Sequence, residues 1–131
     1  MHCQLDHVHI VCRDLDNMIR VFTGDFGARL IGMKIFGGVD GASLDLGGTL
    51  INLRVKQPRD NFMENPSGKT YGYHHIGLLV DDVDASYREL RDKGYQFTAP
   101  PEDVVGFRVA FFAGPEDMVF ELVQVRPVNP D

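Results

Sequence analysis

Two pairs of polar residues recur at nearly the same interval along this chain, each within an apolar segment. His7 and His75 are 68 positions apart, and Asn52 and Glu121 are 69 positions apart. Imidazole nitrogens and carboxylate oxygens bind divalent ions such as Mn, Fe, Co, Ni and Zn. We therefore predict a site for one of these ions, with His7, His75 and Glu121 as ligands and Glu121 also able to act as a base.

Asn52 makes the two halves unequal. An amide oxygen is a weak metal ligand, and an amide cannot act as a base. Asn52 therefore has two possible roles, either as a further ligand or as a hydrogen-bonding partner of a metal-bound water or substrate. We assign it to substrate binding.

Three further polar residues lie two positions from these, and side chains two positions apart on a strand point to the same face. His9 follows His7, Arg54 follows Asn52, and Tyr73 precedes His75. We expect His9 to act as an acid, a base or an oxyanion partner, and Tyr73 to donate its hydroxyl. Arg54 is expected to hold a substrate carboxylate or phosphate. A packed histidine at the rim and an arginine at a solvated strand end are the alternatives.

Apolar periodicity indicates that a repeated βαβββ unit positions these residues. The first unit is predicted to have a strand over 5–12, a helix beginning after Asp14 or Asp16 and ending at Gly27, and strands near 28–35, 42–46 and 49–55. The second is predicted to have a strand over 73–80, a helix from Asp82 or Asp84 to about Lys93, and strands at 95–98, 107–112 and 118–125. Alternation directs Val8, Ile10 and Cys12 toward the helix and His7 away from it.

The predicted fold class is therefore α+β, with two tandem βαβββ modules. They are expected to form a curved mixed sheet around a metal cleft, with the helices on the outer face. We predict a single domain over 1–131, with modules at about 4–56 and 72–126 and a linker at about 57–71. The linker is polar and long enough to act as a lid.

Composition excludes several classes of protein. The chain has 131 residues, 44% of them hydrophobic and 24% charged, and a net charge of −6. Scattered basic residues and an acidic balance argue against nucleic-acid binding, and no apolar run is long enough to span a membrane. The first residues do not have the pattern of a signal peptide. We expect a cytoplasmic protein in which Cys3 and Cys12 are reduced thiols, with Cys12 buried.

Several motifs resemble the vicinal oxygen chelate superfamily, whose members include glyoxalase I, methylmalonyl-CoA epimerase, fosfomycin-resistance proteins and extradiol dioxygenases. The motifs are Leu5-Asp6-His7-Val8, Gly72-Tyr73-His74-His75-Ile76, Val80-Asp81-Asp82-Val83-Asp84, and Phe112-Ala113-Gly114-Pro115 leading to Phe120-Glu121-Leu122. The resemblance implies that His7, His75 and Glu121 are the metal ligands. Asn52 stands where glyoxalase I and the epimerase have Glu or Gln, which counts against the glyoxalase I reaction. The turn at 114–117 departs from the common Asp-Pro-Asp-Gly, a change expected to touch only structure.

Two or three open positions on such an ion suit a small substrate that offers two neighbouring oxygens. We therefore expect a metal-dependent lyase or isomerase of the glyoxalase-like type, which stabilises an enolate or oxyanion intermediate. An iron(II) extradiol-type dioxygenase and a non-catalytic drug-binding resistance protein of the same fold are the alternatives. Because monomers of this fold often pair, we also expect a homodimer.

Overall fold

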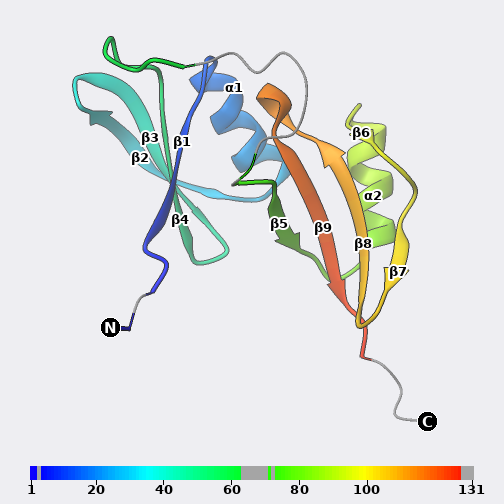
Figure 1. Ribbon diagram of the computed structural model, residues 1–131. Helices are drawn as coiled ribbons and strands as arrows, with labels where there is room; N and C mark the ends of the chain where they lie inside the picture. The colour runs from blue at the N-terminus through cyan, green and yellow to red at the C-terminus, as the bar shows by residue number, and fades with distance from the viewer. Residues whose placement is uncertain (3, 63–70, 72, 128–131) are drawn as a thin grey trace. The chain divides into compact units, whose positions relative to one another are not determined.

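The computed structural model describes residues 1–2, 4–62, 71 and 73–127, and the chain divides into two compact units, Met1–Asn65 and Pro66–Asp131. Each unit carries one mixed sheet, of four and five strands respectively, with helical segments, so the predicted α+β class with two βαβββ modules is confirmed (Figure 1). None of the described helices is long and apolar enough to cross a membrane.

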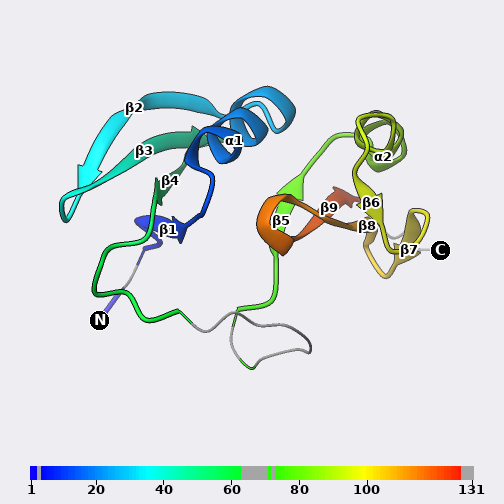
Figure 2. The same ribbon diagram turned by 90° about the horizontal axis from the view of Figure 1, so that it is seen from above.

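The sheet of the first unit has the strand order β1-β4-β3-β2. Its elements are β1 (His7–Val11), α1 (Leu15–Arg20), the π-helical η1 (Val21–Asp25), β2 (Arg29–Phe36), β3 (Val39–Leu46) and β4 (Thr49–Arg54). The first strand, β1, runs parallel to the last, β4, whereas the other pairs are antiparallel. A parallel pair needs a crossover, which the helical segment supplies on one face of the sheet. This segment lies beside β4 (Figure 2).

Strand register separates the two faces of this sheet. On the helical face, Val8 and Ile10 of β1 are opposite Ile51 and Leu53 of β4, which in turn are opposite Leu44 and Ala42 of β3. Leu44 and Leu53 are fully buried, together with Phe22 of the helical segment. Cys12 is also buried, as predicted, whereas Cys3 lies outside the described residues. The opposite face is left to the polar residues of the strands.

The sheet of the second unit has the order β5-β9-β8-β6, with β7 also paired to β8. Its elements are β5 (Ile76–Leu79), α2 (Val83–Asp92), β6 (Gln96–Phe97), β7 (Glu102–Val104), β8 (Phe107–Ala113), the 3₁₀ turn η2 (Pro115–Asp117) and β9 (Val119–Val125). Here too the first strand, β5, is parallel to the last, β9. The helix α2 packs on β8 and β9, with Val83 and Leu90 buried (Figure 2).

The first strand of the second unit is shorter than predicted. It begins at Ile76 rather than Tyr73, so Tyr73 and His75 precede the strand. The strand β7 was not predicted, because Glu102-Asp103-Val104 has no apolar alternation. The predicted linker reaches across residues 63–70, which lie outside the described part of the chain.

The two helical segments begin alike but end differently. Asp14 and Asp82 are their N-caps, and each carboxylate accepts a hydrogen bond from a backbone N–H of the first turn. Each segment is followed by a glycine with positive φ, Gly27 and Gly94. Gly27 follows its cap by 13 positions and Gly94 by 12. The π-helix Val21–Asp25 is therefore where the first unit accommodates its additional residue.

The turn before β9 adopts a left-handed backbone without glycine. Glu116 has φ 55° and Asp117 has φ 60°, a region that costs an ordinary side chain about 1 kcal/mol or more. Gly114 stands at its start because the Phe120 ring occupies the space that a Cβ would need. The altered turn keeps the hairpin between β8 and β9 in place.

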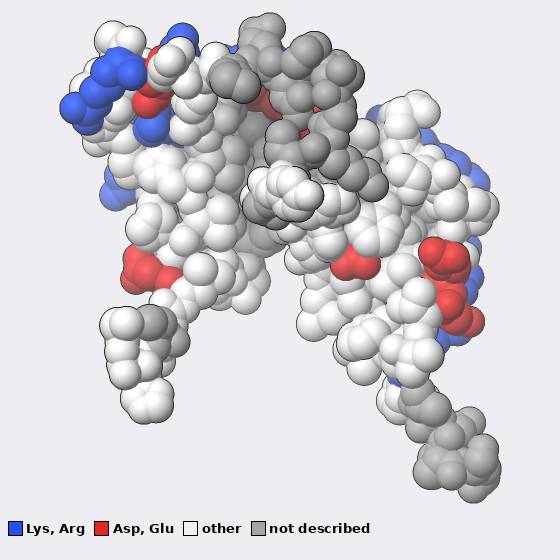
Figure 3. All heavy atoms as spheres, in the orientation of Figure 1, with Lys and Arg blue, Asp and Glu red and all other residues white. Residues whose placement is uncertain are grey.

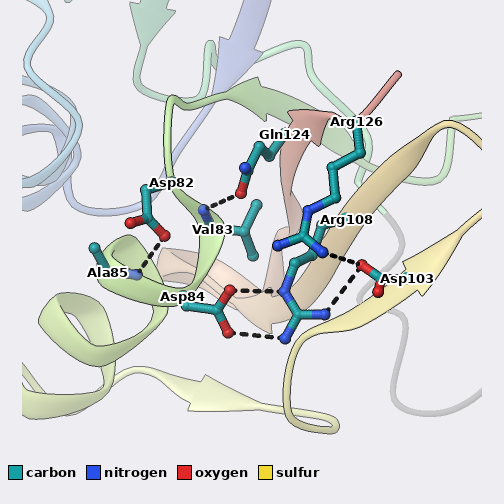
Figure 4. A network of polar contacts seen from close by, with 8 residues as sticks. All are labelled: Asp82, Val83, Asp84, Ala85, Asp103, Arg108, Gln124 and Arg126. Carbon is teal, nitrogen blue, oxygen red and sulfur yellow. Dashed lines mark hydrogen bonds and ion pairs between the residues drawn. The ribbon is translucent and has the colours of Figure 1, made fainter. Parts of the chain in front are cut away.

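An ion-pair network joins α2 to the sheet of the second unit (Figure 4). Arg108 of β8 donates two hydrogen bonds to Asp84, of 2.7 and 2.8 Å, and a third of 3.1 Å to Asp103. Arg126 donates to the same Asp103 at 3.0 Å. Acidic side chains gather over β7 in Figure 3, with basic side chains beside them. Because Arg108 is the shared donor, this arginine has a structural role.

The Asp84–Arg108 pair gives a pH dependence with a defined sign. Hydrogen bonds from Arg108 hold the pKa of Asp84 below its ordinary value of 3.8. Its contribution to stability is therefore present above the ordinary pKa of 3.8 and is lost as the pH falls through the lowered pKa. We expect Asp84→Asn to lower the midpoint of urea unfolding at pH 7, and the difference from the parent to be smaller at pH 3.

The control is Asp92→Asn at the end of the same helix, where the carboxylate lies 3.4 Å from the neighbouring Arg91 and is largely exposed. This variant should unfold at the parent midpoint at both pH values. Equal midpoints of Asp84→Asn and the parent at pH 7 would contradict the assignment.

Candidate metal and substrate site

His75 and Glu121 form the closest pair among the predicted ligands. His75 Nε2 lies 3.4 Å from Glu121 Oε1, and both side chains are partly buried. His75 sits just before β5, whereas Glu121 lies in β9 beside Gly77. A side chain at Gly77 would lie against the Glu121 carboxylate, so the glycine keeps this side of Glu121 open. The ring of Phe111 packs edge-on against His75, with 5.2 Å between the centroids.

Each of the two predicted histidine ligands is held by the residue directly before it. His7 Nδ1 lies 2.7 Å from Asp6 Oδ2, and His75 Nδ1 lies 2.8 Å from His74 Nδ1. A histidine whose Nδ1 is hydrogen-bonded presents its Nε2 to a metal, and such a partner orients the ring. The Asp6 carboxylate accepts, so His7 donates from Nδ1 and its Nε2 lone pair is available for coordination; the same holds for His75 in the tautomer in which it donates to His74.

Asn52 is buried on β4, and its carbonyl oxygen has a partner within the sheet. The Ser43 hydroxyl of β3 donates to Asn52 Oδ1 at 2.6 Å. Asn52 is opposite Ser43 on one side and opposite His9 on the other, so the three side chains share one face. His9 stands where the second unit has Gly77. Asn52 is therefore more enclosed than Glu121.

An aromatic ring lies beside His9. Phe36 at the end of β2 packs edge-on against the imidazole, with 4.9 Å between the centroids. The ring reaches this place by crossing over Gly41 of β3, where an added Cβ would meet both the Phe36 ring and the Leu53 carbonyl oxygen. Partial burial, followed by the charges of Arg54 and His7, lowers the pKa of His9. The imidazole is therefore neutral at pH 7 and able to accept a proton.

Arg54 shares this face but is already engaged. Its Nη1 donates to Asp60 Oδ2 at 2.7 Å and to the Val55 carbonyl at 3.1 Å. The hydrogen bond from Arg54 lowers the pKa of Asp60, so the pair stays ionised. Tyr73 is 62% exposed as a residue, and partial burial raises the pKa of its hydroxyl. Tyr73 therefore keeps its proton at neutral pH.

The predicted site residues divide between the two units. The first unit brings His7, His9, Asn52 and Arg54 to one face of its sheet, and the second brings His75 and Glu121 together. Within the described residues, no group of three His, Cys, Asp or Glu side chains converges as a metal site. Sequence reasoning missed Ser43, Phe36 and Asp60, which contact Asn52, His9 and Arg54 respectively. Ser43 lies between Ala42 and Leu44 in β3, and this polar residue within a short apolar stretch was a signal, whereas Phe36 and Asp60 gave none.

Comparison with known proteins identifies the family. The model of the Glyoxalase/Bleomycin resistance protein/Dioxygenase superfamily matches residues 4–122. The chain belongs to this superfamily. The match covers both βαβββ units, so the resemblance in the strand motifs is confirmed.

Proteins with different names and activities resemble the chain. A lactoylglutathione lyase of Schizosaccharomyces pombe is 24% identical over 148 residues, which cover 97% of this chain and 49% of that protein. The chain thus spans about half the length of this curated relative. A glyoxalase family protein from Bacillus cereus has a TM-score of 0.79 at 20% identity, with 97% of each chain covered. A mutant of the fosfomycin resistance protein FosX from Listeria monocytogenes, complexed with Mn(II) and 1S,2S-dihydroxypropylphosphonic acid, has a TM-score of 0.73 at 20% identity, covering 96% of this chain and 93% of that one.

Gly41 is expected to be essential for the arrangement beside His9. In Gly41→Ala the new methyl group would meet a backbone oxygen as well as the Phe36 ring. Overpacking of this kind costs about 1–3 kcal/mol, which urea unfolding would detect. Gly32→Ala on the neighbouring strand is the matched control, because no atom lies within 4 Å of its added Cβ. That variant should stay within about 0.5 kcal/mol of the parent, and equal losses in both would contradict the role of Gly41.

Proposed function

We propose that the chain is a divalent-metal-dependent lyase or isomerase, and that it binds a small substrate through two neighbouring oxygens. The observation that carries this proposal is the His75–Glu121 pair, with Nε2 and Oε1 3.4 Å apart. The superfamily membership and the similarity to a lactoylglutathione lyase support an enzyme of the glyoxalase-like type. The Mn(II) and vicinal diol bound to FosX support a metal and a substrate with adjacent oxygens.

The donor atoms fit a divalent ion. Metal–nitrogen and metal–oxygen bonds are about 2.0–2.2 Å long, so two ligands of one ion lie roughly 2.9–3.5 Å apart. The separation in the His75–Glu121 pair falls within this range. The Nδ1 contact of His7 with the Asp6 carboxylate leaves its Nε2 to coordinate, and Nε2 of His75 already faces Glu121. We propose His7, His75 and Glu121 as the ligands of Mn, Fe, Co, Ni or Zn, and one anionic and two neutral donors suit all five.

The bound ion would act as a Lewis acid that stabilises negative charge on a substrate oxygen. Glu121 is the base in this proposal, because its carboxylate is partly buried and Gly77 leaves one side of it open. One of its Oε atoms would take a proton from the substrate carbon next to the carbonyl. The same carboxyl group would then return this proton to the adjacent atom of the substrate. Neutral His9 would exchange a proton with a substrate oxygen, and Tyr73 would donate its hydroxyl to the same group.

Arg54 supplies the positive charge for an acidic substrate. Its Nη1 is tied to Asp60 and to the Val55 carbonyl, which fixes the guanidinium on the face that carries Asn52. Among the described residues its Nε and Nη2 atoms have no hydrogen-bonding partner, so they remain for a carboxylate or phosphonate. We propose Arg54 and Asn52 as the residues that bind substrate.

Metal binding tests the proposed ligands. We expect His75→Ala and Glu121→Gln each to weaken Mn²⁺ binding at least about 100-fold, since even residues that only orient ligands contribute 10–100-fold. Isothermal titration calorimetry measures the change. His2→Ala and Glu89→Gln are the controls, because both side chains are exposed and neither belongs to the proposed site.

Substrate chemistry separates this proposal from its alternatives. Exchange of deuterium from solvent into an α-keto acid or acyl thioester, lost in Glu121→Gln, is the expected result. Oxygen uptake with catechols would instead indicate an iron(II) dioxygenase. Absence of binding of Mn, Fe, Co, Ni and Zn would contradict the enzyme and favour a drug-binding protein.

We also propose that two copies of the chain form a homodimer in the cytoplasm. The strand β2 ends the sheet of the first unit, so one side of its backbone has no neighbouring strand among the described residues. Its Met33 and Ile35 side chains are 59% and 69% exposed. Apolar side chains along a free strand edge favour association with another protein surface. We propose that this surface belongs to a second copy of the chain.

Disruption of this strand tests the dimer. The double variant Met33→Lys, Ile35→Lys should sediment as a monomer at a concentration where the parent is a dimer, because each lysine would place a charge in the interface. Val105→Lys is the control, since Val105 is 90% exposed in the turn between β7 and β8. A monomeric parent, or a double variant that remains a dimer, would contradict the proposal.

A further inference from the structure

We propose that Ser43 fixes the Asn52 carboxamide so that it offers its NH₂ group, and not its carbonyl oxygen, to an oxyanion of the substrate. In this assignment Asn52 is a hydrogen-bond donor rather than a metal ligand, and Ser43 is the residue that positions it. The inference rests on the proposed function, because it concerns the substrate of the same site.

The Ser43–Asn52 hydrogen bond determines the orientation of the amide. A hydroxyl donates one hydrogen bond, and Oδ1 is the sole acceptor atom of an asparagine side chain. The distance of 2.6 Å from the Ser43 hydroxyl oxygen to Asn52 Oδ1 indicates a short bond. Ser43 and Asn52 are 6% and 8% exposed and stand opposite each other on β3 and β4. A reversed amide could donate its NH₂ to the same hydroxyl oxygen, but N–H···O bonds are about 2.9 Å long, so the separation of 2.6 Å favours Ser43 as the donor and Oδ1 as the acceptor.

The same hydrogen bond leaves the Asn52 NH₂ group for another partner. No described residue hydrogen-bonds to this nitrogen, whereas the oxygen is bound. Among the described residues, no fully buried side-chain nitrogen or oxygen lacks a partner, so the NH₂ group is not sealed within the core. It lies on the face that carries His9, away from the helical face. A donor in a largely enclosed position that lacks a partner favours an oxygen with negative charge.

The second unit shows what the first has changed. Ser43 and Asn52 are opposite each other in the first sheet, and Phe111 and Glu121 are opposite each other in the second. Phe111 has no hydroxyl with which to hold the carboxylate, so among the described residues only His75 contacts its oxygens, which we leave to a metal or a proton. The first unit thus has an amide, Asn52, together with a hydroxyl that orients it, whereas the second has a carboxylate, Glu121, opposite an apolar ring. We therefore assign Asn52 as a hydrogen-bond donor and Glu121 as an acceptor.

Calorimetry with Mn²⁺ alone and then with oxalate on the Mn²⁺-loaded protein tests the assignment. Oxalate offers two neighbouring oxygens, as the proposed substrate does. We expect Asn52→Leu, which cannot coordinate, to bind Mn²⁺ within about threefold of the parent. Oxalate binding should weaken about tenfold in Ser43→Ala and at least tenfold in Asn52→Asp, since the aspartate repels the anion but still accepts from Ser43. Ser43→Thr retains the hydroxyl and should bind oxalate within about threefold of the parent.

A second measurement follows the amide itself. In the Zn²⁺-loaded protein labelled with ¹⁵N-asparagine, the side-chain NH₂ resonances of Asn52 should shift when oxalate is added. The same resonances should shift less in Ser43→Ala, where the amide is free to turn. This readout would not move if Ser43 merely stabilised the fold.

The outcomes separate this inference from the proposed function. A loss of Mn²⁺ affinity above tenfold in Asn52→Leu would make Asn52 a ligand and overturn the inference. Oxalate that does not bind to the Mn²⁺-loaded parent, or that binds equally to Ser43→Ala, would also overturn it while leaving the metal centre intact. Failure of the parent to bind any of the five metals would instead overturn the proposed function, and the inference with it.

Discussion

The parallel pairing of the first and last strands in each unit is the constraint on which the rest of the structure depends. β1 pairs with β4, and β5 pairs with β9. Parallel neighbours require a crossover, and the helical segment of each crossover covers one face of the sheet. That face takes the apolar side chains, so polar side chains gather opposite. The grouping of His7, His9 and Asn52 follows from this topology rather than from any attraction among them.

The two units have the same topology but differ in chemistry. Three pairs of equivalent positions show this: His9 and Gly77, Ser43 and Phe111, and Asn52 and Glu121. In the first unit, His9 and Ser43 place two hydrogen-bonding side chains beside the amide of Asn52. In the second, the equivalent Gly77 and Phe111 have no hydrogen-bonding side chain to place beside the carboxylate of Glu121. An internal repeat has thus become two unequal half-sites without a change of topology.

Most of the fold could be predicted from the sequence because its signals are local. Alternating apolar residues marked the long strands, Asp14 and Asp82 marked the helix starts, and Gly27 and Gly94 marked their ends. Strand parity also placed His9 on the face of Asn52. The partners Ser43, Phe36 and Asp60 depend on register between strands or on the path of a loop, neither of which a single strand pattern records. β7 was missed because it is held by the ion pairs of Arg108 and by pairing to β8, not by apolar alternation.

The π-helix at Val21–Asp25 shows how such a repeat tolerates change in length. One extra residue between cap and glycine is contained within a single widened turn. The strands on either side keep the same order in both units: the first strand pairs with the last in parallel, and the strand after the helix pairs antiparallel with the strand before the last. The helical crossover is thus the part of the unit that takes up a difference in length, while the face that carries His7 and His9 keeps its strand order.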